Sequence, residues 1–275
     1  MRAGPALLAA SLGLFGPVPD RPGEAAPYTF AIVPQGPPAV IGRLWGPVVE
    51  RIAADAGVPL RMKLYERIED FQTDLASGAV DFAYGNPIHA IHARWSARYR
   101  PLVRDEKPVR GVFFVARDSP YDSVASLAGR EVAFVGPWTF CSVTLRHEVQ
   151  EIGIVPRFVG TVANAFKTVV LGMVSAGGVL DTNLEAAPAD VRARLRVIYQ
   201  TPPMAPHALV AHPRVPRAVS DRIVRAVLVL AASEEGPKLL GPVRMERPVA
   251  AEYERDYGPL EHVVDPGLSP PGAVE

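Results

Sequence analysis

Polar and aromatic side chains recur directly after the apolar runs that we expect to form strands. They are Gln35, Tyr84, Asn86, His89, Thr139, Phe140, Cys141, Ser142, Thr161, Asn164 and Asp181. The carboxyl ends of parallel strands and the amino ends of the following helices meet at one edge of a sheet, so we predict that these side chains surround one ligand-binding cleft. Their amide, hydroxyl and imidazole groups could hold a small polar molecule by hydrogen bonds. For each residue, a helix cap or a turn is the open alternative.

A soft-metal site is an alternative use of some of the same residues. His89 and His92 are three residues apart in a predicted helix and could face the same side. With Cys141, Met204 and His207 they would supply the imidazole, thiolate and thioether groups that copper prefers. The sequence contains no compact ligand spacing such as His-x-His or Cys-x-x-Cys. We therefore predict no metal and no other cofactor, and keep the soft-metal site as the alternative.

The sequence carries no motif of a known catalytic chemistry. It has no Gly-x-Ser-x-Gly, no Gly-rich phosphate loop and no His-Glu-x-x-His. Cys141 lies near a predicted helix start, where the pKa of a thiol is lowered in principle. His147 follows on the same helix one to two turns later, which is a poor geometry for a nucleophile and its base. We predict that the protein is not an enzyme, with catalysis or sensing on the same fold as alternatives.

A regular alternation of strand and helix patterns should position the candidate residues. In the first part of the chain we predict strands at Tyr28–Val33, Leu60–Leu64, Val80–Tyr84 and Val112–Ala116. The helices between them are the amphipathic segment Leu44–Ala56, Ile68–Ala76 and Ile88–Ala97. Gly57 and Gly78 follow the first two helices as C-terminal glycines do.

The strand–helix pattern then starts again. Further strands are predicted at Val132–Val135, Arg157–Val159, Gly178–Leu180, Leu195–Tyr199 and Ala208–Ala211. Further helices are predicted at Ser142–Gln150, Ala163–Leu171 and Ser220–Ser233. Two βα series predict an α/β protein of two lobes, each a mostly parallel sheet flanked by helices. We assign residues 27–116 and 208–265 to the first lobe and 117–207 to the second, joined by two hinge strands, with Val112–Ala116 pairing with Ala208–Ala211.

The charge balance excludes some classes of partner. The 275 residues include 29 Lys and Arg against 29 Asp and Glu, so the chain lacks the broad basic field of a nucleic-acid-binding protein. No apolar run reaches the roughly 18 to 20 residues that span a bilayer. The single cysteine excludes an internal disulfide framework.

The two ends of the chain differ from the segments between them. Residues 1–26 combine a basic start, an apolar stretch and small residues near Ala25, which is typical of a secretory signal. A disordered extension is the alternative. Residues 266–275 are rich in Pro and Gly, and we predict a disordered tail. An export signal would place the mature protein in the periplasm.

Several segments resemble one protein family. Gly78–Pro87 reads Gly-Ala-Val-Asp-Phe-Ala-Tyr-Gly-Asn-Pro, Tyr121–Val135 contains a Ser-Leu-Ala-Gly-Arg-Glu-Val-Ala-Phe segment, and Pro202–Pro206 is a proline-rich crossing. Together with the Gly160–Gly172 spacing, these segments resemble periplasmic substrate-binding proteins of phosphate, phosphite and phosphonate ABC transporters. The resemblance spans residues 28–215 and implies a type 2 periplasmic-binding-protein fold. It also implies an oxyanion held at a helix start by hydroxyl and backbone N–H groups.

The chain departs from the family at positions that would contact the anion. Where the family has Ser-Thr-Ser-Gly, this chain has Thr139-Phe140-Cys141-Ser142. The family's Gly-Ser-His becomes Gly160-Thr161-Val162, and a first-lobe tyrosine falls on Ile68. These changes predict a ligand with an apolar portion, or one less highly charged than phosphate.

The resemblance and the two-lobe pattern together predict a solute-binding protein. We expect a monomer that captures a small, oxyanionic or partly apolar ligand between its lobes. Closure around the ligand would be recognised by an ABC permease at the inner membrane. A sensor or chaperone built in the same way is the alternative that the sequence leaves open.

Overall fold

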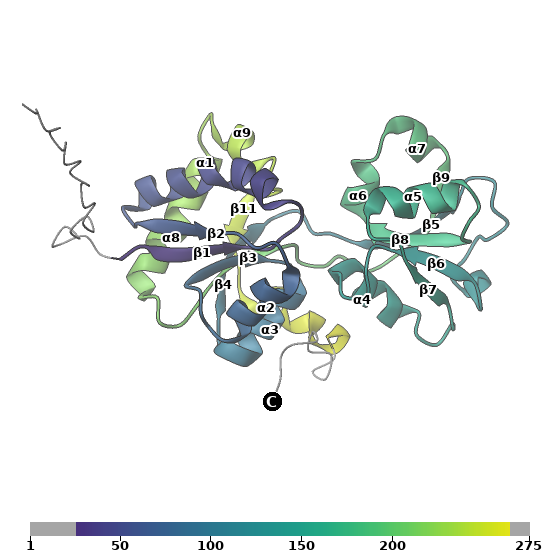
Figure 1. Cartoon of the computed structure of the whole chain (residues 1–275), viewed down its shortest axis with the longest axis horizontal. Helices are drawn as coiled ribbons and strands as arrows, with labels where there is room; N and C mark the ends of the chain where they lie inside the picture. Colours follow the sequence, from purple (N-terminus) through teal and green to yellow (C-terminus); the bar gives the residue numbers. More distant parts are fainter. Residues whose placement is uncertain (1–25, 265–275) are drawn as a thin grey trace, which may run out of the picture.

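The computed structural model describes residues 26–264, which form two α/β lobes (Figure 1). One lobe contains a six-stranded sheet and the other a five-stranded sheet. The predicted division into two α/β lobes is therefore confirmed. The predicted export signal, apart from residue 26, and the predicted tail lie outside the described residues.

The first sheet brings together strands from both halves of the chain. Its spatial order is β11 (Pro248–Ala250), β4 (Arg100–Asp105), β10 (Ala208–Ala211), β3 (Phe82–Gly85), β1 (Tyr28–Ile32) and β2 (Leu60–Lys63). β1 pairs in parallel with β2 and β3, whereas β10 is antiparallel to both β3 and β4. The sheet is therefore mixed, with two parallel and three antiparallel pairings, and the prediction of a mostly parallel sheet is wrong here. We did not predict β4, whose sequence Arg-Pro-Leu-Val-Arg-Asp lacks a clear apolar alternation.

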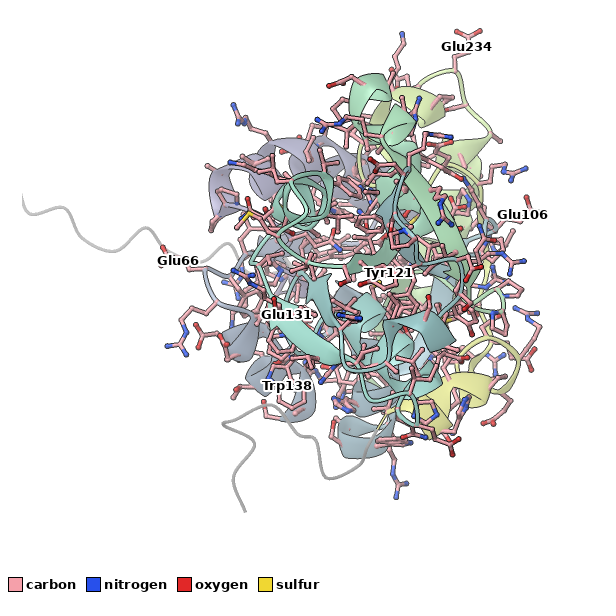
Figure 2. All side chains as sticks on the ribbon, turned by 90° about the vertical axis from the view of Figure 1, so that its right-hand side faces the viewer. Glu66, Glu106, Tyr121, Glu131, Trp138 and Glu234 are labelled. Atoms are coloured by element: carbon pink, nitrogen blue, oxygen red, sulfur yellow. The ribbon has the colours of Figure 1, made fainter. Side chains whose placement is uncertain are left out.

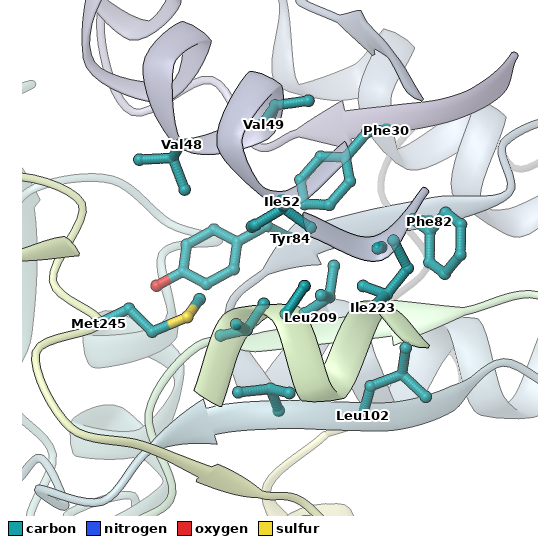
Figure 3. Packing of buried hydrophobic residues seen from close by; sticks show 14 of the residues in the cluster. Phe30, Val48, Val49, Ile52, Phe82, Tyr84, Leu102, Leu209, Ile223 and Met245 are labelled. Atoms are coloured by element: carbon teal, nitrogen blue, oxygen red, sulfur yellow. The ribbon is translucent and has the colours of Figure 1, made fainter. Parts of the chain in front are cut away.

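Helices cover both faces of the first sheet. One face carries α1 (Pro38–Ala56), α8 (Arg217–Ala231) and α9 (Gly236–Leu240), and the other carries α2 (Ile68–Ala76), α3 (Pro87–Ala97), α10 (Tyr253–Asp256) and the short helix η2 (Gly258–Val263) (Figure 1). Helix α1 buries Trp45, Val48 and Ile52 on one side and ends at Gly57, whose φ of 58° suits glycine. Figure 3 shows Val48 and Ile52 of α1 in the same buried cluster as Phe30 and Tyr84 of the sheet.

The second sheet belongs to the other lobe. Its order is β7 (Val155–Phe158), β6 (Glu131–Phe134), β8 (Ala176–Leu180), β5 (Gly111–Ala116) and β9 (Leu195–Gln200). The helices α5 (Val162–Val170), α6 (Asp181–Glu185) and α7 (Ala189–Ala193) lie on one face, and α4 (Phe140–Glu148) and η1 (Ala125–Leu127) on the other. In β8, a Cβ at Gly178 would collide with the Phe134 ring and lie 2.9 Å from Leu145, so α4 packs closely only on glycine.

The predicted pairing of Val112–Ala116 with Ala208–Ala211 is wrong. β5 pairs with β8 and β9 in the second sheet, and β10 pairs with β3 and β4 in the first. Strand β5 therefore belongs to the second lobe rather than the first, where we had placed it. Both segments are short and apolar, and a segment of this kind fits the buried centre of either sheet. The sequence of each segment therefore does not determine which strand it pairs with.

Two short crossings connect the lobes. The first follows β4 and the second leads from β9 to β10, and they meet where Val109 and Met204 form an isolated antiparallel bridge. The backbone N–H of Val109 donates to the Met204 carbonyl at 2.9 Å, and the reverse bond measures 2.8 Å. The proline-rich segment Pro202–Pro206 is thus a crossing, as predicted, but the connection is one bridge and not a pair of hinge strands.

Within residues 26–264, no helix combines the length and the apolar character needed to cross a bilayer.

Candidate functional site

A cavity of about 420 Å³ lies where the two lobes and the crossings meet. The first lobe contributes Gln35, Tyr84, Asp105, Val243, Arg244, Glu246 and Arg247 to its wall. The crossings contribute Lys107, Val109, Pro206 and His207, and the second lobe contributes Leu180, Thr182, Glu185 and Ala186. A cavity of this size, lined by both charged and apolar side chains, suits a small molecule.

An aromatic and polar cluster forms the inner wall of the cavity. The Tyr84 ring stacks on His207 with centroids 5.5 Å apart and contacts Trp45 of α1 at 4.6 Å. Burial and the nearby positive charge of Arg244 lower the pKa of His207 to about 4, so this ring is neutral at physiological pH. The Gln35 amide nitrogen lies 2.6 Å from His207 Nε2, which accepts the hydrogen bond in the neutral ring. The inner wall of the cavity is therefore polar but uncharged at Gln35, Tyr84 and His207.

Arg244 supplies a cation at the rim of the first lobe. It follows α9 in the segment that leads to β11, and its φ of 58° lies in the left-handed region that residues with a Cβ seldom adopt. Among residues 26–264 its exposed guanidinium forms no hydrogen bond and no ion pair. Residues held in such a conformation cluster at binding sites, where the surrounding fold offsets the strain. Arg244 is thus a cation free to meet a ligand.

All but one of the other charged groups of the cavity wall are already paired; the exception is Glu246, an exposed residue whose carboxylate forms no hydrogen bond or ion pair among residues 26–264. The Asp105 carboxylate is buried and accepts the backbone N–H groups of Lys107 at 2.8 Å and of Arg247 at 2.9 Å. The Lys107 ammonium donates to Glu185 at 2.8 Å, and Arg247 pairs with Glu106 at 3.3 Å. Within the described chain, these contacts leave Arg244 as the unpaired cation of the wall.

Of the predicted first-lobe residues, two line the cavity and two do not. Gln35 and Tyr84 are in the wall, as described above. Asn86 caps α3, and its side-chain oxygen accepts the His89 backbone N–H at 3.1 Å. The His89 ring accepts the Asn86 backbone N–H at 3.3 Å, so the two residues form a reciprocal capping box. His89 is only 3% exposed, so both side chains stabilise the start of α3.

The predicted anion cradle at the start of α4 is buried. Thr139 caps the helix, and its hydroxyl oxygen lies 2.7 Å from that of Ser142. Phe140, Cys141 and Ser142 are buried. The Phe140 ring packs with residues of α3 and η2 from the first lobe, which closes this side of the lobe junction. In this conformation the cradle therefore lies outside the cavity.

The remaining predicted residues lie on the second lobe. Thr161 caps α5 by accepting the Asn164 backbone N–H at 3.1 Å, and both side chains are exposed away from the cavity wall. Asp181 starts α6 between the wall residues Leu180 and Thr182, and its carboxylate accepts the Thr182 backbone N–H at 2.8 Å. A direct ligand contact from any of these residues stays a prediction.

The alternatives of a soft metal and a reactive thiol lose their structural basis. Within residues 26–264, no three His, Cys, Asp or Glu side chains come close enough to hold a metal ion. Cys141 is buried, and this burial, together with Asp181, raises the pKa of the thiol instead of lowering it. The prediction of a lowered pKa is wrong, because desolvation of the thiolate outweighs the helix dipole.

Comparison with known proteins identifies the family. The sequence model described as "ABC transporter, phosphonate, periplasmic substrate-binding protein" matches residues 30–257. The chain belongs to this family. Members of the phosphonate-binding family are periplasmic substrate-binding components of ABC transporters, that is, transport proteins and not enzymes. No curated protein sequence matches the chain.

Several solved structures share the fold of this chain. XAC2383 from Xanthomonas citri, bound to chloride ion, superimposes with a TM-score of 0.74 at 16% identity, covering 86% of this chain and 96% of that one. PhnD1 from Prochlorococcus marinus, in complex with methylphosphonate, gives 0.71 at 14% identity over 86% and 96%. The aliphatic sulphonate binding protein SsuA from Escherichia coli gives 0.59 at 16% over 81% and 80%. The predicted family and the type 2 periplasmic-binding-protein fold are both confirmed.

Much of the cavity wall of this phosphonate-binding family member consists of residues that no sequence pattern indicated as ligand contacts. Lys107, Glu185 and Arg244 carried no motif, and His207 was considered only as a metal ligand. The crossing residues and the segment before β11 are remote in sequence from the strand ends that we inspected. The crossings of a two-lobe protein border the cleft between the lobes. Their position could therefore have indicated that Lys107 and His207 line the cavity.

Proposed function

We propose that this protein captures a small anion with an apolar portion in the cavity between its lobes and delivers it to an ABC permease. The observation that carries the proposal is the unpaired Arg244 at the rim of a cavity shared by both lobes. A ligand that contacts both lobes stabilises the closed arrangement more than the open one, and this difference drives closure.

The lining argues against a strongly charged ligand. Three cations (Lys107, Arg244 and Arg247) are balanced by three acids (Asp105, Glu185 and Glu246). The cavity therefore lacks the excess of positive charge that a phosphate dianion would need. Val109, Leu180 and Val243 provide apolar surface beside Arg244. These features support a monoanionic group held by Arg244, with an alkyl portion against the apolar residues.

The same arrangement supports the other parts of the proposed role. Delivery to a permease requires a periplasmic protein, which is consistent with the family and with an export signal in residues 1–26. A monomer is sufficient, because both walls of the cavity come from one chain.

The proposal is tested by thermal shift and calorimetry with phosphate, phosphite, methylphosphonate and short alkylsulfonates. A bound ligand at about 100 times its dissociation constant should add about 2.7 kcal/mol to stability and raise the Tm. We expect methylphosphonate or an alkylsulfonate to bind more tightly than phosphate. If none of these anions shifts the Tm, the proposed ligand class is wrong.

Replacing the unpaired arginine tests its role. Arg244→Ala should weaken binding about ten- to hundred-fold, because a hydrogen bond to a charged group contributes about 1.5–3 kcal/mol. Arg225→Ala is the matched control, since Arg225 is exposed on α8 and lies outside the cavity wall. Equal affinities in the two variants would show that Arg244 does not hold the anion.

A further inference from the structure

One ion pair in the wall of the candidate cavity joins a crossing to the second lobe. The Lys107 ammonium, on the first crossing, donates to the Glu185 carboxylate of α6 at 2.8 Å. Both residues belong to the cavity wall. Within residues 26–264, it is the one ion pair that joins the second lobe to a segment outside that lobe.

We propose that Glu185 is an internal counter-ion: it occupies Lys107 in the ligand-free cavity, must yield that cation to an anionic ligand, and so limits how tightly anions bind. This inference rests on the proposed function. It assigns to Glu185 a role that lowers the affinity for anions and so opposes the attraction provided by Arg244.

Both partners are positioned so that the pair can form without a ligand. The backbone N–H of Lys107 is held by the buried Asp105 carboxylate at 2.8 Å, which fixes the start of the lysine side chain. Glu185 is the last residue of α6, and its carbonyl oxygen accepts a hydrogen bond from Arg192 at 2.5 Å. The two anchored backbones hold the side chains where the ammonium and the carboxylate meet in the cavity wall.

Charge and exposure determine how easily the pair can open. The side chains of Lys107 and Glu185 are 51% and 59% exposed, so water screens their attraction and an incoming anion can replace the carboxylate. The hydrogen bond with Glu185 raises the pKa of Lys107, with smaller contributions from Asp181 and Glu246. Asp181 is less available as a competitor, because its carboxylate already accepts the Thr182 N–H. Glu185 is therefore the anion that a ligand has to displace.

Glu185→Gln is the direct test by affinity. The amide keeps the size of the side chain but removes its charge, so Lys107 no longer has to leave a carboxylate to meet the ligand. We expect methylphosphonate to bind roughly two- to five-fold more tightly, a gain that corresponds to the strength of an exposed ion pair. The gain should decrease as salt is added, because salt screens exposed charges.

Glu131→Gln is the matched control. Glu131 makes a similarly exposed ion pair with Arg157 at 3.5 Å in the second lobe, outside the cavity wall. Figure 2 shows Glu131 away from Glu106, the neighbour of Lys107 in the sequence. The control should bind methylphosphonate as the wild type does. Equal gains in both variants would overturn the proposal, because they would show a general effect of net charge.

A second readout needs no ligand. The rate at which an acylating reagent modifies each lysine can be followed by peptide mass spectrometry, with the exposed Lys167 of α5 as the internal reference. Releasing Lys107 from Glu185 should make its amine more reactive, so Glu185→Gln should speed acylation of Lys107 and leave Lys167 unchanged.

The two readouts separate failure of the inference from failure of the proposed function. An unchanged Lys107 rate in Glu185→Gln overturns the inference even if anions bind. A faster Lys107 rate without any change in affinity shows that the pair forms but does not compete with the ligand, and this also overturns it. Absence of binding to the wild type by every anion in the panel contradicts the proposed function itself.

Discussion

Acid should destabilise this protein through His89, a histidine buried in its neutral form. The side chain is 3% exposed and packs edge-on against Phe71, with ring centroids 5.1 Å apart. Its Nδ1 accepts the Asn86 backbone N–H, and its Nε2 lies 3.3 Å from the Gln72 amide nitrogen. Burial, with smaller contributions from His207 and His92, lowers the pKa of His89 to about 3.

The size of the effect follows from proton linkage. The unfolded chain binds a proton at His89 below a pKa of about 6.5, whereas the folded protein binds it only near 3. Above about pH 6.5 both states are neutral and the full stability is present. As the pH falls below this value, the unfolded state alone is stabilised by protonation. At about pH 5.5 this contributes about 1.4 kcal/mol in favour of unfolding.

The assay is urea unfolding at about pH 7.5 and about pH 5.5 for the wild type and His89→Gln. The variant has lost one capping contact and should be less stable at both pH values, but its stability should fall by about 1.3 kcal/mol less than that of the wild type. Ile91→Val, a change at a buried position of the same helix, removes no titratable group and should keep the wild-type pH dependence. The other histidines are present in all three proteins, so their contributions cancel.

An equal loss of stability in the wild type and in His89→Gln would refute this reasoning. It would mean that His89 takes up its proton in the folded state as readily as in the unfolded one. The capping box would then not require a neutral ring.

Two further predictions concern the packing of the second lobe. Phe140→Ala should reduce the free energy of unfolding by about 3 kcal/mol, because a buried ring is lost. Since this ring joins α4 to the first lobe, the variant should also have a larger radius of gyration in small-angle scattering, and unchanged dimensions would contradict its role between the lobes. Gly178→Ala should cost about 1–3 kcal/mol in chemical unfolding, because the new Cβ meets Phe134 and Leu145. Gly136→Ala, whose Cβ would have its nearest neighbour at 3.6 Å, is the control and should be close to neutral.

Local patterns in the sequence were sufficient for the family and for the longer helices and most of the strands, but not for β4, β11 or the short helices α6, α7 and α9. Apolar periodicity located α1, and Gly57 ended it at the residue where the backbone turns left-handed. The repeated βα series indicated two lobes. These features depend on neighbours within a few residues, where side-chain spacing and backbone geometry act directly.

The same local patterns could not separate helix caps from ligand contacts. Asn86, Thr139 and Thr161 have the residue types and the positions expected for both roles, and in the structure each accepts a backbone N–H of its own helix. The deciding quantity is whether the side-chain oxygen is already paired, which depends on the surrounding packing.

Contacts between remote segments were settled by the assembled fold. Packing placed β5 in the second sheet and β10 in the first, although both are short apolar strands of similar character. It also brought Lys107, Glu185 and Arg244 to one cavity from a crossing, a short helix and the segment before β11. The order of residues along the chain does not show which distant segments become neighbours. Those contacts depend on how apolar surfaces and charges of different segments pack against one another when the lobes form.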